Sequence, residues 1–524
     1  MSFSRYETIF KKMSIAALLI GILLHIIPYL AEHSLFVDDA MVASTIVTRD
    51  FAHLVRTPMD YGQSAPIGYL YAVKICTALF GVSKVSLRIY SLFCFFATCG
   101  LMYYVLSKMY QVKRAMFFMA VFSLLPFYIQ YAAEVKQYTS ECMFTLLTVI
   151  IFWQYFQDKI SLLRLCLLAS MIIWFAFAPV FFIASGMLLA VGEKLRKKDI
   201  KSLVACCLPA LSLVIYYLFW LSGTESNAGA KAYWDLLAFP LVPSSWEDIK
   251  LLVKMAKESI IPLGYSGIIY IFAAFYTLYL WRKEKRQEMY FYVLGCFLLL
   301  IASSLGYYPI IARLMAFFAM MVLVLAAVSL DRLWNMWEEN GRTSGKKTGA
   351  LLCAAAILLG LPFLSTAKQY IRGNLLFNHG TEVVKNLKYL EKHKTDKDMI
   401  YLYCGAQPSY FFEQGFPYGG NNTWDMPKIG TVTDEYIWGK QLNVFNYKKP
   451  YSYEGEPDWE NIRHDVNNIR QFDSVYLFTS HMNAERNVYW QLLLDMLKPY
   501  GTVEVVSSDH DTYLYHFQKK DEIG

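Results

Sequence analysis

Apolar runs long enough to cross a lipid bilayer recur along the first two thirds of the chain. Nine of these runs are each about 16 to 24 residues long, close to the length that a membrane-spanning helix needs. They comprise residues 13–30, 85–106, 115–131, 138–156, 203–221, 260–281, 290–305, 309–330 and 348–364. A further run at 162–191 is about 30 residues long with Pro179 near its middle, which predicts two short helices that meet at Ala178-Pro179.

The overall composition agrees with this pattern. Of the 524 residues, 56% are hydrophobic and 17% are charged, which is too apolar for a soluble protein of this size. We therefore expect a polytopic α-helical membrane protein. The net charge of +7 comes largely from short loops between the apolar runs, so it gives no basic footprint for nucleic acid.

The basic residues of the short loops predict the orientation, because cytoplasmic loops collect Lys and Arg. Five loops are basic: Lys108 with Lys113 and Arg114; Lys159 with Arg164; Lys194, Arg196, Lys197, Lys198 and Lys201; Arg282, Lys283, Lys285 and Arg286; and Arg332, Arg342, Lys346 and Lys347. All five fall on one side if residues 66–80, with Lys74 at the centre, form an interfacial helix instead of a span. This solution predicts about 11 spans, a cytoplasmic N-terminus and an external C-terminal region.

The loop from Ala31 to about Lys84 then lies outside the membrane. It contains two amphipathic segments, 39–55 and 66–80, and the breaker-rich turn 62–66 precedes the second. A second outer loop, 223–259, contains Trp234 and Trp246 and could cover the first.

The composition becomes polar after about residue 366. We expect a helix at 381–392, strands at 399–404 and 474–479, a helix at 485–498 and a hairpin of 502–506 with 512–517. The sequence therefore predicts two domains: a membrane domain at 1–365 that includes the outer loop 31–84, and a small extracytoplasmic α/β domain at 366–524.

Asp38 and Asp39 are adjacent carboxylates just beyond the first apolar run. Such a pair fits a general base with a helper, or a site for a divalent cation. Neighbouring side chains at a helix start diverge by about 100°, so the two acids would do different jobs. The alternative is that one of them caps the helix that follows.

Two further clusters fall at the predicted outer ends of spans. One is Glu134-Val135-Lys136-Gln137-Tyr138, which could equally mark the membrane interface with charge and tyrosine. The other is Tyr307-Tyr308-Pro309 followed by Arg313, expected about one turn inside a span. Burying a cation there favours an anionic partner such as a phosphate, whereas snorkelling to the headgroups is the alternative. Arg88, at the outer start of another span, could join Lys136 and Arg313.

Other chemistry-bearing residues suggest no site of their own. His25 is a lone histidine within the first span, which is more typical of packing than of catalysis. The ten cysteines have no metal-ligand spacing and predict neither a disulfide framework nor a zinc site.

Several of these motifs, taken in order, resemble the GT-C membrane glycosyltransferases. The nearest branch is the family-39-like bacterial proteins, relatives of protein O-mannosyltransferases and of the lipid A aminoarabinose transferase. The motifs are the acidic pair Asp38-Asp39; Gln63-Ser64-Ala65-Pro66, Leu79-Phe80-Gly81 and Leu87-Arg88; Glu134-Val135-Lys136-Gln137-Tyr138-Thr139-Ser140-Glu141; Tyr308-Pro309 with Arg313-Leu314; and Tyr403-Cys404-Gly405-Ala406-Gln407-Pro408. The resemblance covers about residues 14–330 well and the external domain only thinly. Two positions depart from it: Ala65 stands where the lipid A branch commonly has Lys, and Glu141 stands where Asp is usual.

The resemblance implies an inverting transferase in a bacterial inner membrane that uses a polyprenyl-phosphate sugar on the outer face. Asp38 would be the base that deprotonates the acceptor, and Asp39 would orient the acceptor or help to bind a cation. Arg313, with Lys136 and Arg88, would hold the leaving polyprenyl phosphate. The resemblance also implies that Glu134, Tyr138, Gln63 and Tyr308 bind substrate.

The sequence indicates no definite cofactor, and whether the acidic pair needs a divalent cation is left open. The expected partners are the lipid-linked donor, membrane lipids and a protein, lipid or glycan acceptor, with no nucleic acid. The main alternative is a flippase or exporter of lipid-linked sugars, although the candidate residues lie at one membrane face and not at the midplane as in transporters. A catalytically inactive scaffold with a sugar-binding external domain is the third hypothesis.

Overall fold

The computed structural model describes residues 3–31, 33–56, 59–221, 237–341, 345–375, 382–415, 430–444, 456–480 and 487–520. Within the chain two compact units are distinguished. The helical unit comprises Met1–Leu30 and Ser64–Arg372, and the α/β unit comprises Ala31–Gln63 and Gly373–Gly524. The start of the predicted outer loop therefore groups with the C-terminal chain, whereas the sequence boundaries had placed it with the membrane domain. Trp234, Arg342 and the expected starts of two helices, at 381 and 485–486, lie outside the described residues.

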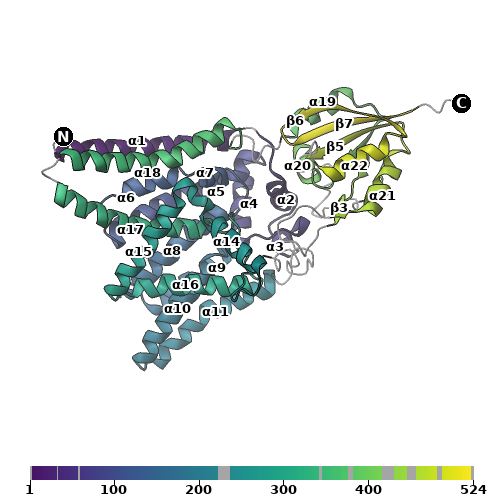
Figure 1. Ribbon diagram of the computed structural model, residues 1–524. Helices are drawn as coiled ribbons and strands as arrows, with labels where there is room; N and C mark the ends of the chain where they lie inside the picture. The colour runs from purple at the N-terminus through teal and green to yellow at the C-terminus, as the bar shows by residue number, and fades with distance from the viewer. Residues whose placement is uncertain are drawn as a thin grey trace. The chain divides into compact units, whose positions relative to one another are not determined.

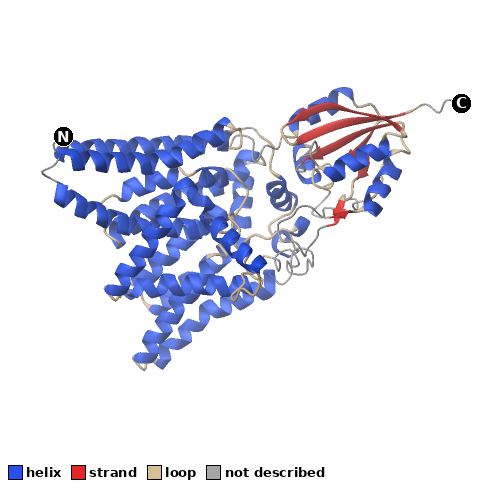
Figure 2. Cartoon of the chain, in the orientation of Figure 1, coloured by secondary structure: helices blue, strands red, loops and turns tan. Residues whose placement is uncertain are grey.

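The helical unit contains no strand among its described residues (Figures 1 and 2). Its elements are α1 (Phe3–Leu30), α4 (Ile67–Phe80), α5 (Lys84–Tyr104), η2 (Val105–Met109), α6 (Ala115–Ser123), α7 (Pro126–Ala132), α8 (Tyr138–Phe156), α9 (Leu162–Phe175), α10 (Pro179–Arg196), α11 (Ile200–Tyr216), η3 (Tyr217–Leu221), α14 (Trp246–Ile260), η4 (Ile261–Ser266), α15 (Gly267–Lys283), α16 (Gln287–Ser304), α17 (Ala316–Gly341) and α18 (Gly345–Ile371).

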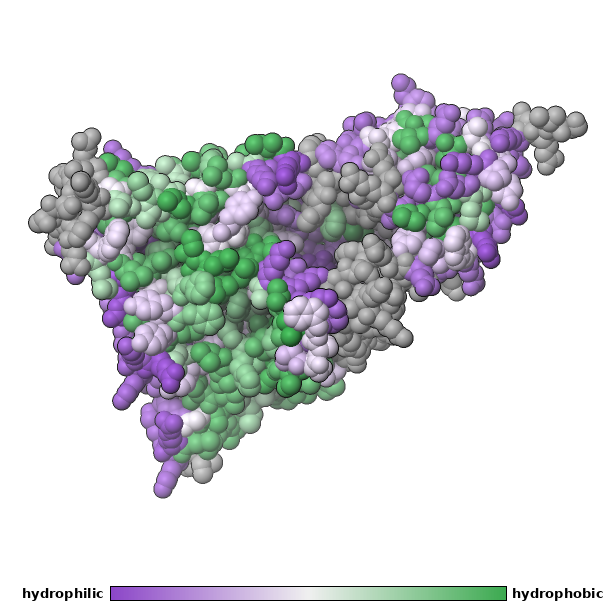
Figure 3. Space-filling view, viewed as in Figure 1, coloured by the Kyte–Doolittle hydropathy of each residue, from purple (hydrophilic) through white to green (hydrophobic). Residues whose placement is uncertain are grey.

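By length and composition, seven helical segments of the described chain could cross a membrane, or eight if the bent pair α6 and α7 is one span. Large apolar side chains are exposed along these helices, and Figure 3 shows a mostly hydrophobic surface between hydrophilic ends. The chain is therefore an integral membrane protein. The predicted number of about 11 spans is not confirmed, because α8, α9 and α10 do not meet the same test of length and apolarity.

Proline explains where two of the predicted apolar runs break. The run at 162–191 forms α9 and α10, and Pro179 is the first residue of α10, as predicted. The run at 115–131 was expected as one span but is bent by 67° between α6 and α7. Pro126 begins α7 and Leu125 before it is extended, because a residue that precedes proline avoids the helical region.

The five basic loops lie at one end of the helical unit, which we call the basic end. Arg114 Nη1 contacts Asp331 Oδ1 at 2.8 Å, and Arg332 Nη1 contacts Glu284 Oε1 at 2.6 Å, which joins three of the loops. The loop after α8 reaches the same place, since Gln157, Gln287 and Tyr110 line one cavity.

The remaining basic loop, at 194–201, follows α10. The Ser185 hydroxyl of this helix donates to the carbonyl of Phe291 at 2.7 Å, and Phe182 packs on Gly295. Helix α10 is therefore antiparallel to α16, so that its end at Arg196 lies at the basic end. This arrangement agrees with the predicted grouping of the five loops.

The α/β unit is built on a mixed five-stranded sheet of order β2-β1-β5-β7-β6. Its strands are β1 (Met399–Leu402), β2 (Tyr436–Trp438), β5 (Ser474–Ser480), β6 (Gly501–Asp509) and β7 (Thr512–Lys519), and a separate short pair is formed by β3 (Asn443–Val444) and β4 (Glu456–Pro457). β1 is parallel to β2 and β5, whereas β7 is antiparallel to β5 and β6. The predicted strands and closing hairpin are confirmed.

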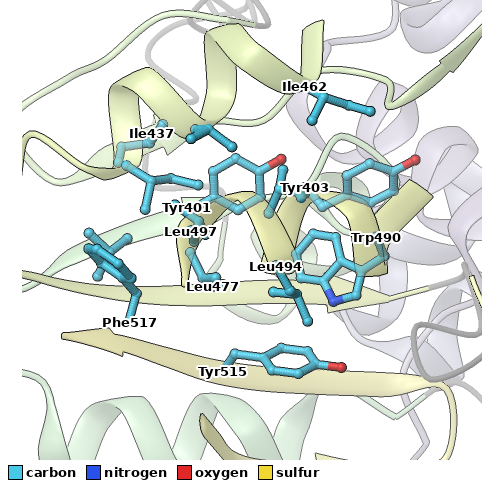
Figure 4. Packing of buried hydrophobic residues seen from close by; sticks show 14 of the residues in the cluster. Tyr401, Tyr403, Ile437, Ile462, Leu477, Trp490, Leu494, Leu497, Tyr515 and Phe517 are labelled. Carbon is cyan, nitrogen blue, oxygen red and sulfur yellow. The ribbon is translucent and has the colours of Figure 1, made fainter. Parts of the chain in front are cut away.

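Helices cover both faces of this sheet. One layer is formed by α19 (Val384–His393) and α20 (Gln407–Glu413), and the other by α21 (Trp459–Ile469) and α22 (Val488–Leu497). Figure 4 shows the second layer, where Trp490 of α22 lies between Tyr403 and Tyr515 of the sheet. The alternation of apolar side chains along β1, with Tyr401 on one face and Ile400 and Leu402 on the other, produces these two cores.

The first part of the predicted outer loop packs on this sandwich. It forms α2 (Val37–Thr48), α3 (His53–Arg56) and the short η1 (Asp60–Gly62), and α2 lies against α20. The amphipathic segment expected at 39–55 is therefore divided between two helices. The Asp50 carboxylate accepts the backbone N–H of His53 at 2.7 Å, which caps a new helix and ends the first.

Candidate functional site

Arg88 lies in the second turn of α5 and its side chain is 0% exposed. A reciprocal capping box between Ser83 and Ser86 begins this helix and so fixes where Arg88 falls. One turn further, the Ser91 hydroxyl lies 3.3 Å from the carbonyl of Lys136, and the Ser91 carbonyl accepts the Thr139 hydroxyl at 2.9 Å. The cluster at 134–138 is therefore held against the turn of α5 that follows Arg88.

The turn between α7 and α8 buries its charged residues. Glu134 and Lys136 are both buried, and Gln130 donates to Glu134 at 2.9 Å. Tyr138 is also buried and contacts Tyr131 edge to face, with 4.9 Å between ring centroids. These side chains are buried within the protein. Their burial does not support the alternative that they only mark the membrane interface with charge and tyrosine.

Tyr308 joins the loop between α16 and α17 to α8. Its hydroxyl donates to the carbonyl of Leu314 at 3.0 Å and lies 3.4 Å from Glu141 Oε2. Burial first, and then the nearby Glu141 carboxylate, raise the pKa of Tyr308 well above its usual value, so the hydroxyl stays a proton donor. The other Glu141 oxygen is buried with no hydrogen-bond partner in the described chain.

Arg313 lies in the turn before α17 and is half-buried. It was expected about one turn inside a span, which is wrong because α17 begins only at Ala316. Tyr308, Pro309 and the turn at 312–315 occupy the start of the apolar run instead. The neighbouring backbone is fixed by Glu258 of α14, which accepts the Ala312 N–H at 2.9 Å.

Glu141 and Glu258 make these contacts but were not among the predicted site residues. Glu141 could have been suspected from its charge within an apolar run, which is rare unless a partner or function retains it. Glu258 gave no such signal, because its role depends on a contact with residue 312 that no local pattern reveals.

The acidic pair lies in the first turn of α2, in the α/β unit. Asp39 is 1% exposed and Asp38 is half-buried. The N-cap residue is Phe36 and makes no side-chain capping bond, so the hypothesis that one of the aspartates is the cap is wrong. Carboxylates in a first helical turn are nonetheless stabilised by the helix dipole. Gln63, from the same unit, donates to the Met41 sulfur at 3.2 Å.

The predicted site residues thus form two sets. Asp38, Asp39 and Gln63 belong to the α/β unit. The others belong to the helical unit: Arg88, Glu134, Lys136, Tyr138, Tyr308 and Arg313. Within the part of the chain that the structure describes, no group of three or more His, Cys, Asp or Glu could hold a metal ion.

His25 packs as expected. Its ring stacks on Phe95 with 3.7 Å between centroids, and its Nδ1 lies 2.8 Å from the carbonyl of Gly21. An apolar cavity of about 420 Å³ lies elsewhere in the helical unit, next to the Tyr308 loop. Its lining residues are Leu213, Val214, Tyr217, Leu218 and Tyr307.

No protein-family model matches this sequence, and no curated protein matches it either. Solved structures do match over nearly the whole chain. ArnT from Cupriavidus metallidurans in the apo state gives a TM-score of 0.54 at 12% identity and covers 97% of this chain and 98% of its own. The same protein bound to undecaprenyl phosphate gives 0.51 at 10% identity, with 98% of each chain covered.

An archaeal structure has the same fold. The Archaeoglobus fulgidus oligosaccharyltransferase tethered to an acceptor peptide gives a TM-score of 0.50 at 9% identity, over 98% of this chain and 74% of that one. ArnT and this enzyme are GT-C glycosyltransferases. The chain therefore has the GT-C membrane fold, as the sequence motifs predicted.

Proposed function

From the GT-C fold, we propose that this chain is an inverting glycosyltransferase that moves a sugar from a polyprenyl-phosphate donor to an acceptor on the outer face of the membrane. The observation that carries the proposal is the burial of Arg88 and Lys136 at one end of the helices, with Arg313 half-buried in a neighbouring loop. Arginine and lysine side chains at this end of the helices are of the kind that hold a phosphate through charge-assisted hydrogen bonds.

A phosphate linked to a lipid fits both the cations and their surroundings. One of the matching ArnT structures is bound to undecaprenyl phosphate. The apolar cavity beside Tyr307 would suit an isoprenoid chain, since its walls are aliphatic and aromatic side chains. Arginine is well suited to the leaving phosphate because its planar guanidinium can donate two parallel hydrogen bonds.

The chain direction supports an outer-face reaction. α5 begins near Arg88 and leads to the basic loop at Lys108, and α17 begins after Arg313 and leads to Arg332. The site residues of the helical unit thus lie at the opposite end from the basic loops. If the basic loops are cytoplasmic, these residues face outward.

Asp38 is the proposed base. As the acceptor oxygen or nitrogen bonds to the anomeric carbon, its proton passes to the Asp38 carboxylate, and the bond from that carbon to the phosphate oxygen breaks. The electron pair leaves with the polyprenyl phosphate, whose growing charge Arg313, Lys136 and Arg88 would stabilise. Asp39, which is buried, would orient the acceptor or help to hold a cation.

The test is a transfer assay with purified protein in lipid nanodiscs. A panel of polyprenyl-phosphate sugars and membrane extract is supplied, and released polyprenyl phosphate and new glycoconjugates are measured. Asp38→Asn should reduce the rate by about 10²- to 10⁴-fold and leave donor binding intact. Asp50→Asn is the matched control, because Asp50 is an exposed acid of the same unit.

Equal release by wild type and Asp38→Asn would show that Asp38 is not the base. Absence of release with every donor would remove the transferase proposal. The same protein in sealed proteoliposomes tests the exporter, which movement of intact donor across the bilayer without release would support.

A further inference from the structure

Helix α14 exposes an apolar stripe on one side. Trp246 and Val253 are 68% and 66% exposed, and Ile249 between them is also exposed. Their spacing of three and four residues places all three on one face of the helix. Ser245 and Asp248 form a capping box at the helix start, so the stripe belongs to a well-defined helix and not to a frayed end.

The other face of α14 is already occupied by the protein. Met255 is buried, and the helix packs against η4 and α17. Glu258 reaches the protein from this helix, since its carboxylate accepts the Ala312 N–H at 2.9 Å. The exposed stripe is therefore a second surface, separate from the one that docks the helix.

Lysines flank this stripe. Lys250 and Lys257 are exposed and lie on the same side of the helix, next to the apolar residues. Lys250 contacts Glu247 at 2.7 Å, but both side chains are largely exposed. This ion pair therefore contributes little stability, and contacts of Lys250 with lipid headgroups could replace it. A tryptophan and lysines beside aliphatic residues are typical of a helix at a membrane interface.

The stripe is continuous with surface that faces lipid. α14, η4 and α15 together form one helical segment, Trp246–Lys283, that is long and apolar enough to contain a membrane span, and Ile268, Phe272 and Phe275 of α15 are exposed. In Figure 3 the hydrophilic and intermediate residues at the position of α14 adjoin the hydrophobic surface of α15. Gly264, with φ of +62°, provides the turn between the two directions.

We propose that α14 lies in the headgroup layer of the bilayer, with Trp246, Ile249 and Val253 inserted at the boundary of the acyl chains. The occupant of this surface is thus the membrane itself, and not a second copy or another protein. One face of α14 packs on the protein. The second, apolar face lies beside a membrane span, and lipid would remove it from water.

This placement has a consequence for the loop before α17. Glu258, at the end of α14, holds the backbone N–H of Ala312, the residue before Arg313. The contact of α14 with the bilayer would therefore fix the position of the Arg313 backbone along the membrane normal. That consequence rests on the proposed function, whereas the membrane placement itself does not.

The test places the photo-cross-linker benzoylphenylalanine at Ile249 or Val253 of the full-length protein in nanodiscs of phosphatidylethanolamine and phosphatidylglycerol. The same cross-linker at Glu247, which is exposed outside the stripe, is the matched control. Mass spectrometry after irradiation should find lipid adducts at positions 249 and 253 at several times the level at position 247. The result does not depend on enzymatic activity, so it stands or falls separately from the proposed function.

Adducts with another polypeptide, or lipid adducts at positions 249 and 253 no higher than at position 247, would overturn the proposal. A second variant keeps the test informative if cross-linking is inefficient. Val253→Asp should make α14 accessible to a protease that leaves it intact in wild-type nanodiscs, because a carboxylate is expelled from the acyl boundary. Unchanged protection in Val253→Asp would also contradict it.

Discussion

Glu382 holds Ser34 through both of its carboxylate oxygens: one accepts the Ser34 backbone N–H at 3.1 Å and the other accepts the Ser34 hydroxyl at 2.8 Å. The Ser34 hydroxyl in turn accepts the Val383 N–H at 3.0 Å. A second bond follows immediately, from the Ser409 hydroxyl to the carbonyl of Leu35 at 2.9 Å. The segment that leads into α2 is therefore fixed to the sandwich just before Asp38 and Asp39.

Glu382→Ala should lower kcat of the proposed transfer by about 10- to 100-fold with a smaller change in donor KM, because the acids on α2 lose their anchor while the donor-binding residues are untouched. The variant should also lose about 1 to 3 kcal/mol of stability, since buried donors are left unpaired. Glu382→Gln should recover part of kcat. A transfer assay and thermal unfolding of the same preparations measure both effects.

Ser409→Ala is the comparison for this anchor, because it removes one bond to Leu35 and should give a smaller effect of the same kind. If Glu382→Ala unfolds at a lower temperature but keeps the wild-type kcat, Glu382 is structural only.

Such an anchor could not be predicted from the sequence, because Ser34 and Glu382 are 348 positions apart and neither belongs to a motif. Features that depend on residues near one another in the sequence could be predicted. Pro179 correctly marked a helix boundary, and short strand-like runs correctly marked β1, β5 and β7. Pro126 was missed because it lies near the end of a continuous apolar run, where proline could also be tolerated within a span.

The candidate site was predictable to a similar extent. Motif order picked out Arg88 and Lys136, whose burial the structure then showed. The bond of Tyr308 toward Glu141 and that of Glu258 to the Ala312 backbone depend on how distant helices pack. Helix packing is set by tertiary shape, which single-sequence periodicity does not contain.

Arg313→Ala should raise donor KM and lower kcat/KM by about 10- to 100-fold, which corresponds to the loss of a charge-assisted hydrogen bond. Arg313→Lys should recover only part of this loss, because an ammonium group cannot make the bidentate contact. Arg332→Ala is the control, since Arg332 is an exposed arginine of the basic end. Donor titrations with each variant provide the measurement, and equal kcat/KM for Arg313→Ala and Arg332→Ala would remove Arg313 from the site.

Arg114→Ala should destabilise the helical unit by about 3 to 5 kcal/mol, because the buried Asp331 loses its only guanidinium partner in the described chain and keeps only neutral hydrogen bonds from two backbone N–H groups and Asn335. Arg114 also pairs with Glu338, so the cation joins the start of α6 to α17 at two points. Donor KM should remain close to wild type, since this contact lies at the basic end. Thermal unfolding in detergent measures the loss of stability. Glu193→Ala, which breaks the more exposed ion pair with Lys197, is the control with which Arg114→Ala is compared.

The Arg114 variant can be checked further with Asp331→Asn. The double variant should be less destabilised than the sum of the two single variants, because Asp331→Asn removes the carboxylate that Arg114→Ala leaves without its cation, while Glu338 loses its partner in both. Additive effects would show that the ion pair does not hold the helices together.

Acidification should loosen the sheet of the α/β unit through His516. Burial lowers the pKa of this histidine below its usual value, and this outweighs the carboxylates of Asp398 and Glu504, which act in the opposite direction. The folded state therefore favours the neutral ring, whose Nε2 lies 2.8 Å from the Ser474 hydroxyl on β5. The contribution of His516 is complete above the unfolded pKa, about 6.5, and is lost as the pH falls through that value toward the lower folded pKa.

Hydrogen exchange of the full-length protein between about pH 7.5 and pH 5.5 tests this, because the chosen interval brackets the unfolded histidine pKa. After correction for intrinsic exchange rates, β5 and β7 should lose protection at the lower pH. His516→Gln should remove most of that loss, since glutamine can still accept the Ser474 bond but does not titrate. His393→Gln is the matched control, because His393 is an exposed histidine of the same unit whose ring contacts the carbonyl and ring of Tyr389 on α19. An undiminished pH response in His516→Gln would assign the effect to other groups.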